Sequence, residues 1–202
     1  MKAAKTAAAI VMLAAIMAFV AVPAAAQENY FGQTKVNLHN GYYFLIPDHY
    51  VTINTVFPLM DGIEPITKAY SNKLTAANAL FMSFKLPETD QTLKEMGIEN
   101  VIADKMKQTI NVKIARAIEM NGRDTFFLRG ETKDTYTLET SRFGGPSSRS
   151  TSRTQVKMEV VMYIIKEGDY VYYSMFQTPV QYFGTNFRTF MEIQNSFSNK
   201  PL

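Results

Sequence analysis

The stretch that decides the fold runs from Gln155 to Gln177 and reads QVKMEVVMYIIK, then EG, then DYVYYSMFQ. Both long segments are rich in β-branched and aromatic residues, which favour strands. Glu167 and Gly168 separate them, and a short connection containing Gly is typical of a β-hairpin. The stretch therefore predicts two long antiparallel strands, 155–166 and 169–177.

The residues before this hairpin predict further strands. Asn121-Gly122 is a strong hairpin signal because a type I′ turn needs positive φ at both central residues. It separates a strand that starts at about Asn111 from a second strand, 124–131. Alternating or apolar runs predict other strands at 34–38, 42–46, 50–57 and 79–84. The stretch 58–78 contains two Pro and a Gly and predicts an irregular connection, with room for a short strand or a turn of helix.

Two stretches have the apolar spacing of helices. After Pro87, Thr89 or Asp90 can cap a helix that continues to about residue 109. Thr178-Pro179 predicts the start of a second helix. Its inward stripe is predicted to comprise Phe183, Phe187, Phe190, Met191, Gln194 and Phe197. The order of strands, helix, antiparallel strands and helix indicates an α+β fold with a mainly antiparallel sheet covered by helices.

Residues 141–154, SRFGGPSSRSTSRT, have no apolar period and predict a flexible loop. Arg142, Arg149 and Arg153 in this loop are candidate partner- or anion-binding residues, because the guanidinium group binds carboxylates and other anions in a bidentate way. The alternative is a solvated hairpin tip without a ligand.

The N-terminus has the three parts of a secretory signal peptide. Lys2 and Lys5 form a basic start, residues 7–22 are uncharged and apolar, and Ala24-Ala25-Ala26 supplies a cleavage site. The apolar run is short for a bilayer core, which needs about 20 residues, so a cleaved signal is favoured over a transmembrane anchor. We expect residues 1–26 to be a cleaved signal, 27–40 a leader with the first short strand, 41–198 one domain and 199–202 a tail.

Composition excludes several kinds of chemistry. The 202-residue chain has no Cys, which excludes disulfides, thiol catalysis, thiolate zinc sites and a lipidated Cys anchor. Cleavage after Ala26 leaves 176 residues and removes two Lys and no acidic residue, so the formal charge falls from +3 to +1. A near-neutral chain gives no reason to expect nucleic acid as a partner. We expect a soluble exported protein, periplasmic or secreted.

Other residues that could carry chemistry have simpler explanations. Tyr172 and Tyr173 face opposite sides of a strand, so at least one of Tyr170, Tyr172 and Tyr173 could line an outer surface or a pocket; packing against the final helix is the alternative. His39 and His49, the latter beside Asp48, have no paired nucleophile, and solvated turns explain both.

Metal binding has weak support in the sequence. The acidic groups at 61–64 and 131–134 lack the ligand spacing of a calcium loop. Core packing explains the methionines on apolar faces, which are Met82, Met106, Met158, Met162, Met175 and Met191. We therefore expect no metal and no cofactor.

Four segments together resemble the PsbP-like family. Residues 42–57 match its opening strand, Pro and turn, with Tyr50 where the family usually has Trp. Residues 92–106, 117–131 and 168–198 are similar to its Gly-then-helix segment, its central hairpin, and its closing strand and helix. The resemblance implies an α-β-α sandwich with a central antiparallel sheet and a non-enzymatic role through protein contacts. Together with the signal peptide, it predicts an exported bacterial member of this family.

These observations support an exported, non-catalytic protein that binds another protein or an envelope component. Two alternatives stay open. The chain could carry a small apolar or anionic ligand in a pocket between sheet and helix, which requires a deep cavity lined by Tyr and Met. An enzyme of unfamiliar type would require Asp48, His49 and other polar groups to converge in one cleft.

Overall fold

A computed structural model describes residues 29–30, 32–53, 65–72, 75–86, 90–144 and 148–201. The predicted hairpin lies at its centre, as β11 (Met158–Glu167) and β12 (Tyr170–Pro179). The two strands pair antiparallel along their whole length, which confirms the predicted hairpin. The first strand begins at Met158 rather than at Gln155, because Gln155 and Val156 belong to a preceding strand that pairs with Tyr136 and Thr137. Because Glu167 pairs with Tyr170, the turn residues are Gly168 and Asp169 rather than Glu167 and Gly168, and Gly168 supplies the positive φ of 56°.

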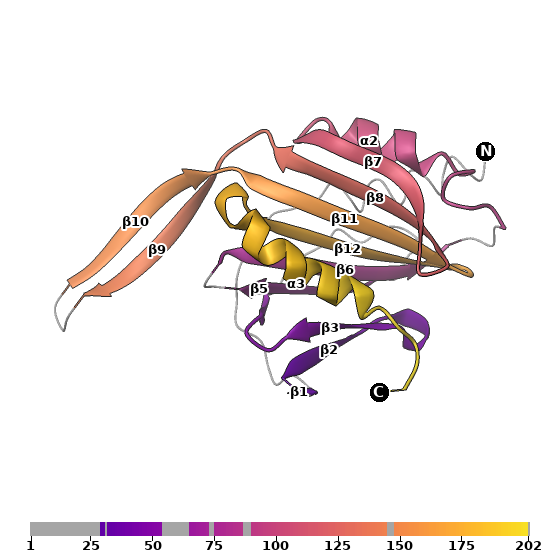
Figure 1. The fold of residues 1–202 in the computed structure, drawn as a ribbon, viewed down its shortest axis with the longest axis horizontal. Coiled ribbons are helices and arrows are strands. Elements are labelled where there is room, and N and C mark those ends of the chain that lie inside the picture. Colours follow the sequence, from indigo (N-terminus) through magenta and orange to yellow (C-terminus); the bar gives the residue numbers. More distant parts are fainter. Residues whose placement is uncertain are drawn as a thin grey trace.

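The hairpin is part of a seven-stranded antiparallel sheet with the order β4-β5-β6-β12-β11-β8-β7 (Figure 1). The other strands are β4 (Val51–Ile53), β5 (Ile66–Asn72), β6 (Ala77–Lys85), β7 (Ile110–Met120) and β8 (Arg123–Thr132). Asn121 and Gly122 have φ of 53° and 74°, so the turn between β7 and β8 has the predicted backbone. The short strand allowed for within 58–78 is β5.

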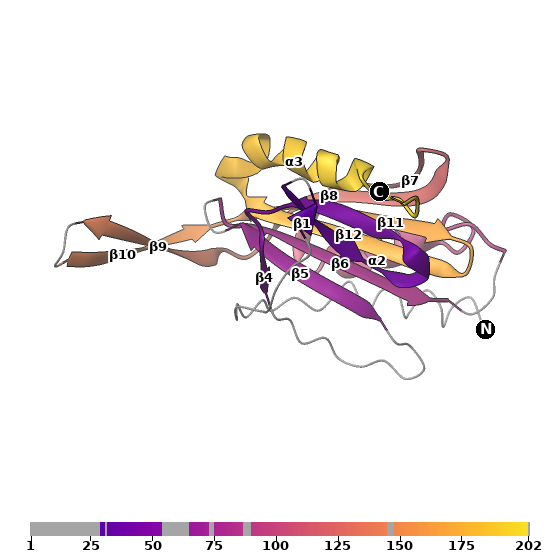
Figure 2. The same cartoon turned by 90° about the horizontal axis from the view of Figure 1, so that it is seen from below.

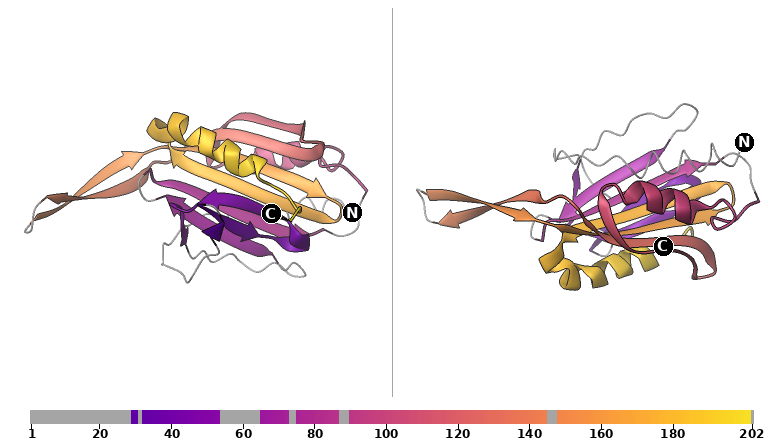
Figure 3. Two further views of the ribbon diagram at one scale, coloured as in Figure 1. Left: turned by 60° about the horizontal axis from the view of Figure 1, so that its bottom comes forward. Right: turned by 90° about the horizontal axis from the view of Figure 1, so that it is seen from above.

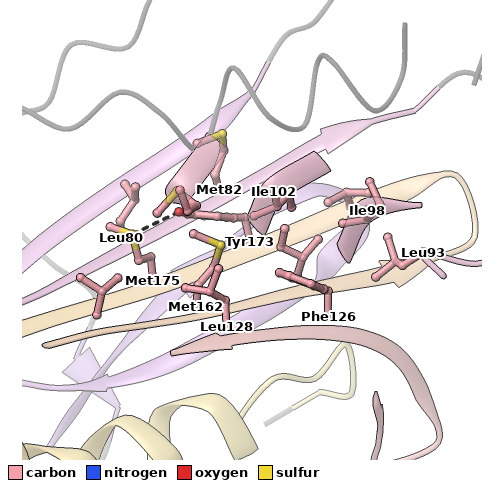
Figure 4. Packing of buried hydrophobic residues seen from close by; sticks show 14 of the residues in the cluster. Leu80, Met82, Leu93, Ile98, Ile102, Phe126, Leu128, Met162, Tyr173 and Met175 are labelled. Atoms are coloured by element: carbon pink, nitrogen blue, oxygen red, sulfur yellow. Dashed lines mark hydrogen bonds between the residues drawn. The ribbon is translucent and has the colours of Figure 1, made fainter. Parts of the chain in front are cut away.

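Helix α2 (Ile98–Met106) covers one face of this sheet. It is shorter than predicted because Gly97, at φ 68°, separates it from the turns before it. The predicted cap Thr89 lies outside the described residues. The capping contacts that the structure describes are those of Thr92, at the start of the turns before Gly97: its hydroxyl accepts from the Glu95 N–H at 3.1 Å, and Glu95 Oε2 accepts from the Thr92 N–H at 2.8 Å. Figure 4 shows the core under this helix, where Tyr173 lies among methionines and aliphatic residues.

The opposite face is covered by helix α3 (Phe183–Asn195) together with a second, three-stranded sheet. That sheet contains β1 (Asn29–Tyr30), β2 (Gln33–Asn37) and β3 (Tyr43–Pro47), and a short 3-10 turn, η1 (His39–Gly41), joins the last two. Figures 2 and 3 show α2 and α3 on opposite faces of the large sheet. The predicted sandwich with helices on both faces is therefore correct only in part, because strands share one layer with α3.

The start of the last helix also differs from the prediction. Thr178 and Pro179 belong to β12, where they pair with Glu159 and Met158. A 3-10 turn, η2 (Val180–Tyr182), follows before α3 begins at Phe183. Thr178 is fully buried and its hydroxyl accepts a hydrogen bond from Asn186 at 2.7 Å, so a residue that resembles a helix cap instead anchors α3 to the sheet.

Gly130, in β8, is a sensitive test of the packing between β7 and β8. A Cβ at this position would meet the side chain of Ile110 and would lie 2.7 Å from the carbonyl oxygen of Asn111. We expect Gly130→Ala to lower the free energy of unfolding by about 2 kcal/mol, because overpacking against backbone forces the strands apart. Urea denaturation measures the change.

Gly184→Ala is the matched control, since a Cβ at Gly184 in α3 meets nothing within 4 Å. It should leave stability unchanged or raise it slightly, because Ala favours a helix over Gly. Equal stability of the two variants would show that β7 and β8 are not packed as described.

Candidate functional site

Two strands leave the large sheet and form a separate ribbon. β9 (Tyr136–Gly144) and β10 (Ser148–Val156) pair antiparallel, from Tyr136 opposite Val156 to Gly144 opposite Ser148. The ribbon, defined here as 136–144 and 148–156, projects beyond the body of the protein (Figures 1 and 2). Nine residues of extended strand span about 30 Å.

The loop predicted for 141–154 is therefore wrong where the structure describes it. These residues form paired strands, although they have no apolar period. Apolar and polar residues alternate along a strand only when one face of the strand is buried against a core and the other faces solvent. A ribbon that leaves the body lacks such a face, so the pattern that identifies the other strands could not identify this one. Its Thr residues were the available signal, because β-branched residues favour strands.

The register separates the three predicted Arg residues. Arg142 pairs with Ser150, Arg149 with Phe143, and Arg153 with Glu139. Since successive strand residues alternate between faces, positions 149 and 153 lie on one face of the ribbon and position 142 lies on the other. Anion binding by these residues stays a prediction, and a single anion on one face of the ribbon would not meet all three positions.

Hydrogen bonds from the buried Thr132 hold the ribbon at its root. The Thr132 hydroxyl donates to the carbonyl oxygen of Asp134 at 2.9 Å and accepts from the Met158 N–H at 3.0 Å. Thr132 ends β8 and Met158 begins β11, so this hydroxyl joins the strands that enter and leave the ribbon. The Lys157 carbonyl accepts from Val180 N–H at 3.0 Å and fixes the second strand against η2.

A buried carboxylate lies beside this root. Glu159, in β11, is 2% exposed and binds Arg129 Nε at 2.6 Å and Lys113 Nζ at 2.8 Å. Glu131 adds further pairs, at 3.4 Å from Lys113 and 3.7 Å from Lys157. The hydrogen bond from Lys113 to Glu159 raises the pKa of the Lys113 ammonium, although partial burial opposes the rise. We call these five residues the root network.

Sequence reasoning missed the root network because its members come from three strands and from Lys157, which lies between β10 and β11. Lys113 lies at a bulge between Val112 and Ile114 in β7, and only the register brings it near β11. One signal was available: Glu159 is an acidic residue within an apolar strand, and buried charges require partners.

The predicted surface or pocket tyrosines lie mostly in the core. Tyr172 and Tyr173 do face opposite sides, but they are 0% and 4% exposed and belong to the two separate hydrophobic clusters. Burial raises the pKa of both phenols. Their hydroxyls donate to the His39 carbonyl and to Met175 Sδ, each at 3.2 Å. Only Tyr170 is half-buried, with its ring 5.6 Å from that of His39.

The histidines make structural contacts. His39 lies in η1, where its Nδ1 is 2.9 Å from the hydroxyl oxygen of the fully buried Ser83. His49 is exposed in the turn after β3 and packs on the ring of Tyr50. The neighbouring Asp48 accepts a hydrogen bond from the Thr34 hydroxyl at 3.1 Å. The described contacts of Asp48 and His49 are thus those of a surface turn.

The remaining candidates are also accounted for where they are described. The acidic group at 61–64 lies outside the described residues, and Glu131 belongs to the root network. In the described ranges, no group of three or more His, Asp or Glu residues could hold a metal ion. Within the same ranges, no helix is long and apolar enough to cross a membrane.

Comparison with solved structures places this architecture among known folds. The solution structure of cyanobacterial PsbP (CyanoP) from Synechocystis sp. PCC 6803 matches with a TM-score of 0.54 and 12% identity, covering 88% of this chain and 98% of that one. The chain therefore has a PsbP-like fold. No family model and no curated protein matches the sequence.

Two further similarities are lower. The Ran-binding protein Mog1p of Saccharomyces cerevisiae has a TM-score of 0.46 and 12% identity, over 86% of this chain and 96% of that one. A Pseudomonas aeruginosa protein of unknown function, described as a putative regulator, has a TM-score of 0.43 and 12% identity, over 84% and 99%. Both values are too low to define a fold relationship.

The root network predicts unequal costs for removing its members. Arg129→Met leaves the buried Glu159 carboxylate with fewer partners, and we expect it to lower the free energy of unfolding by about 2 kcal/mol. Glu159→Gln leaves Lys113 and Arg129, which are 44% and 33% exposed and remain accessible to water, so its cost should be about 1 kcal/mol. Urea denaturation compares the two variants.

Glu192→Gln is the control, because its pair with Arg188 on α3 is 60% and 88% exposed and should contribute less than about 0.5 kcal/mol. If Glu159→Gln proved more costly than Arg129→Met, the carboxylate would not be the group that most requires its partners.

Proposed function

We propose that this chain is an exported, non-catalytic protein that binds another protein through its ribbon. The observation that carries the proposal is the projection of β9 and β10 from the body as a separate two-stranded sheet. An isolated two-stranded hairpin is marginally stable in water. A long one is therefore best explained by a partner that covers it in the cell.

The composition of the ribbon supports contact with a protein. It contains three Arg and a single acidic residue, Glu139, together with many Ser and Thr hydroxyls. Arg is enriched at protein interfaces, and hydroxyl groups supply hydrogen bonds without a large loss of side-chain entropy. Tyr136, at the root, is 48% exposed and adds an aromatic group of the kind found at interaction hot spots.

A non-catalytic role is supported by the contacts of the polar residues that catalysis would use. Ser83, the partner of His39, is fully buried and so inaccessible to a substrate. Asp48 binds Thr34 and does not orient a histidine base in the described contacts. The fold resembles that of PsbP, but a likeness at 12% identity concerns the fold alone.

No observation favours the ligand-carrier alternative. It requires a cavity lined by Tyr and Met, whereas Tyr173 packs against Met175 and Met162 in one cluster. Tyr172 packs against Tyr42 and Phe197 in the other.

Site-specific photo-crosslinking in the native host tests the ribbon. A photoreactive amino acid at Thr137 or Gln155, both exposed ribbon positions, should produce a covalent adduct with a discrete protein. The same group at Arg188, on the outer side of α3, should produce none. Adducts are detected by immunoblotting and identified by mass spectrometry.

The variant Arg142→Glu/Arg149→Glu should remove the ribbon adduct, while Arg188→Glu should not. Circular dichroism and urea denaturation confirm that each variant is folded. If neither ribbon position formed an adduct, the proposal that the ribbon is a binding element would be contradicted.

Export is tested at the N-terminus. We expect the protein isolated from the cell envelope or medium to begin at Gln27, because the site ends in Ala24-Ala25-Ala26. Replacing Ala24 and Ala26 with Lys should block processing, and intact-mass measurement distinguishes the two forms. An intact N-terminus in the wild-type protein would instead indicate that the apolar segment is retained.

A further inference from the structure

Helix α3 covers only part of its face of the large sheet. It lies across the central strands and leaves β7 and β8 uncovered on that side (Figure 1). The register places Ile114 opposite Arg129, Arg116 opposite Phe127, and Ile118 opposite Thr125. We call Ile114, Arg116, Ile118, Phe127 and Arg129 the β7–β8 face.

Two contacts show that this face lies on the α3 side. The Phe127 ring is 5.1 Å from that of Tyr163, whose hydroxyl donates to Met191 Sδ on α3 at 3.2 Å. The Arg129 guanidinium lies 4.3 Å from the centre of the Phe183 ring at the start of the helix. The β7–β8 face and the adjacent edge of α3 therefore form one continuous surface.

The exposed residues of this surface have the composition of a binding site. Ile114 is 38% exposed, and Ile118 and Phe127 are half-buried. Phe183 and Phe187 of α3, with rings 5.0 Å apart, are also only partly buried. Aromatic, aliphatic and Arg side chains side by side are typical of the centre of a protein interface.

The charges of the surface favour an acidic partner. Arg129 is paired with Glu159, and Arg123, the first residue of β8, is paired with Glu167 at 2.5 Å. Arg116 is exposed, and the interactions of the described residues give its guanidinium no carboxylate partner. Arg116 thus supplies a positive charge within an apolar surface, where a carboxylate would complement it.

The outer edge of β7 is less suited to binding than the face. Glu99 of α2 accepts a hydrogen bond from the Ala117 N–H, which occupies one of the donors that an added strand would need. The bulge at Lys113 interrupts the edge further. Bulges and charged residues are the devices that prevent strand addition at sheet edges. A partner is therefore expected to lie on the face, beside α3, rather than to extend the sheet.

We propose that the β7–β8 face docks an amphipathic helix of a partner protein. Its apolar stripe packs on Ile114, Ile118 and Phe127, and an acidic side chain beside that stripe pairs with Arg116. The helix lies next to α3 and completes the layer that α3 leaves unfinished. A second copy of this chain is a poorer occupant, because an isologous contact brings two copies of the same basic surface together. This proposal does not depend on the ribbon.

A pair of designed peptides tests the proposal. Both are helices of about 18 residues, or five turns, with the same Leu stripe and with either Glu or Lys beside it. Titration into the 15N-labelled mature protein at low salt should move the amide signals of 114–118, 125–129 and 183–187 for the Glu peptide. The Lys peptide should bind about tenfold more weakly, because a like charge then faces Arg116.

Substitutions sharpen the test. Arg116→Glu should reverse the preference between the two peptides. Ile114→Ser should weaken the Glu peptide about fivefold through lost apolar contact. Arg188→Glu is the matched control at an exposed position of α3 and should change neither affinity.

Four outcomes of the peptide titrations would overturn the proposal. They are signal changes confined to other parts of the protein, equal binding of the two peptides, and no binding of the Glu peptide at millimolar concentration. The fourth is a preference unaffected by Arg116→Glu. Sedimentation showing a dimer that Ile114→Glu dissociates would assign the surface to a second copy instead. Binding to phosphatidylglycerol vesicles that Ile114→Glu abolishes, without peptide binding, would assign it to a membrane.

Discussion

The whole structure depends on one constraint: β11 and β12 are buried on both faces. Val160 and Val161 are adjacent in β11, face opposite sides and are both 0% exposed. Tyr172 and Tyr173 repeat this arrangement in β12. A sheet whose central strands are apolar on both sides needs a covering layer on each side. Helix α2 supplies one layer, and α3 with β2 and β3 supplies the other.

The layer formed by α3 is held in place by buried polar pairs as well as by apolar packing. The Ser174 hydroxyl donates to Gln194 Oε1 at 2.6 Å, and Asn186 donates to the Thr178 hydroxyl at 2.7 Å. Each pair joins β12 to α3, and each would leave a buried polar group unsatisfied if the helix shifted along the strand. These pairs therefore favour one position of α3, and that position leaves β7 and β8 uncovered.

Local signals allowed much of the sheet to be predicted from the sequence. The strands around Asn121-Gly122 and Gly168 are identified by their own residues and turns. The layer that β2 and β3 form with α3 could not be predicted, because assignment of a strand to a sheet depends on distant partners. The Thr178-Pro179 signal was misleading for a related reason: Thr178 pairs across the sheet, and this tertiary contact overrides the local preference for a helix start.

The candidate site was predicted less completely than the fold. The Arg residues of 141–154 were identified by composition, but their division between two faces follows from the register with β9. No local sequence pattern predicts the root network, since Lys113, Arg129 and Glu159 are far apart in the sequence. Only the alignment of β7, β8 and β11 brings them together.

The two candidate surfaces are connected through β8. Arg129 belongs to the β7–β8 face, and Thr132, three residues later, holds the root of the ribbon. Glu159 binds Arg129 on the β7–β8 face. It also lies next to Met158, and the Met158 N–H donates to the Thr132 hydroxyl at the root of the ribbon. The Glu159 carboxylate therefore helps to fix the strands on which both surfaces depend. Its charge is compensated within the root network. Arg116 on the β7–β8 face and the ribbon, which contains three Arg and one Glu, both carry positive charge that favours an acidic partner. An acidic protein long enough to reach from the β7–β8 face to the ribbon would engage both, and joining two weak contacts in one partner raises the overall affinity well above that of either.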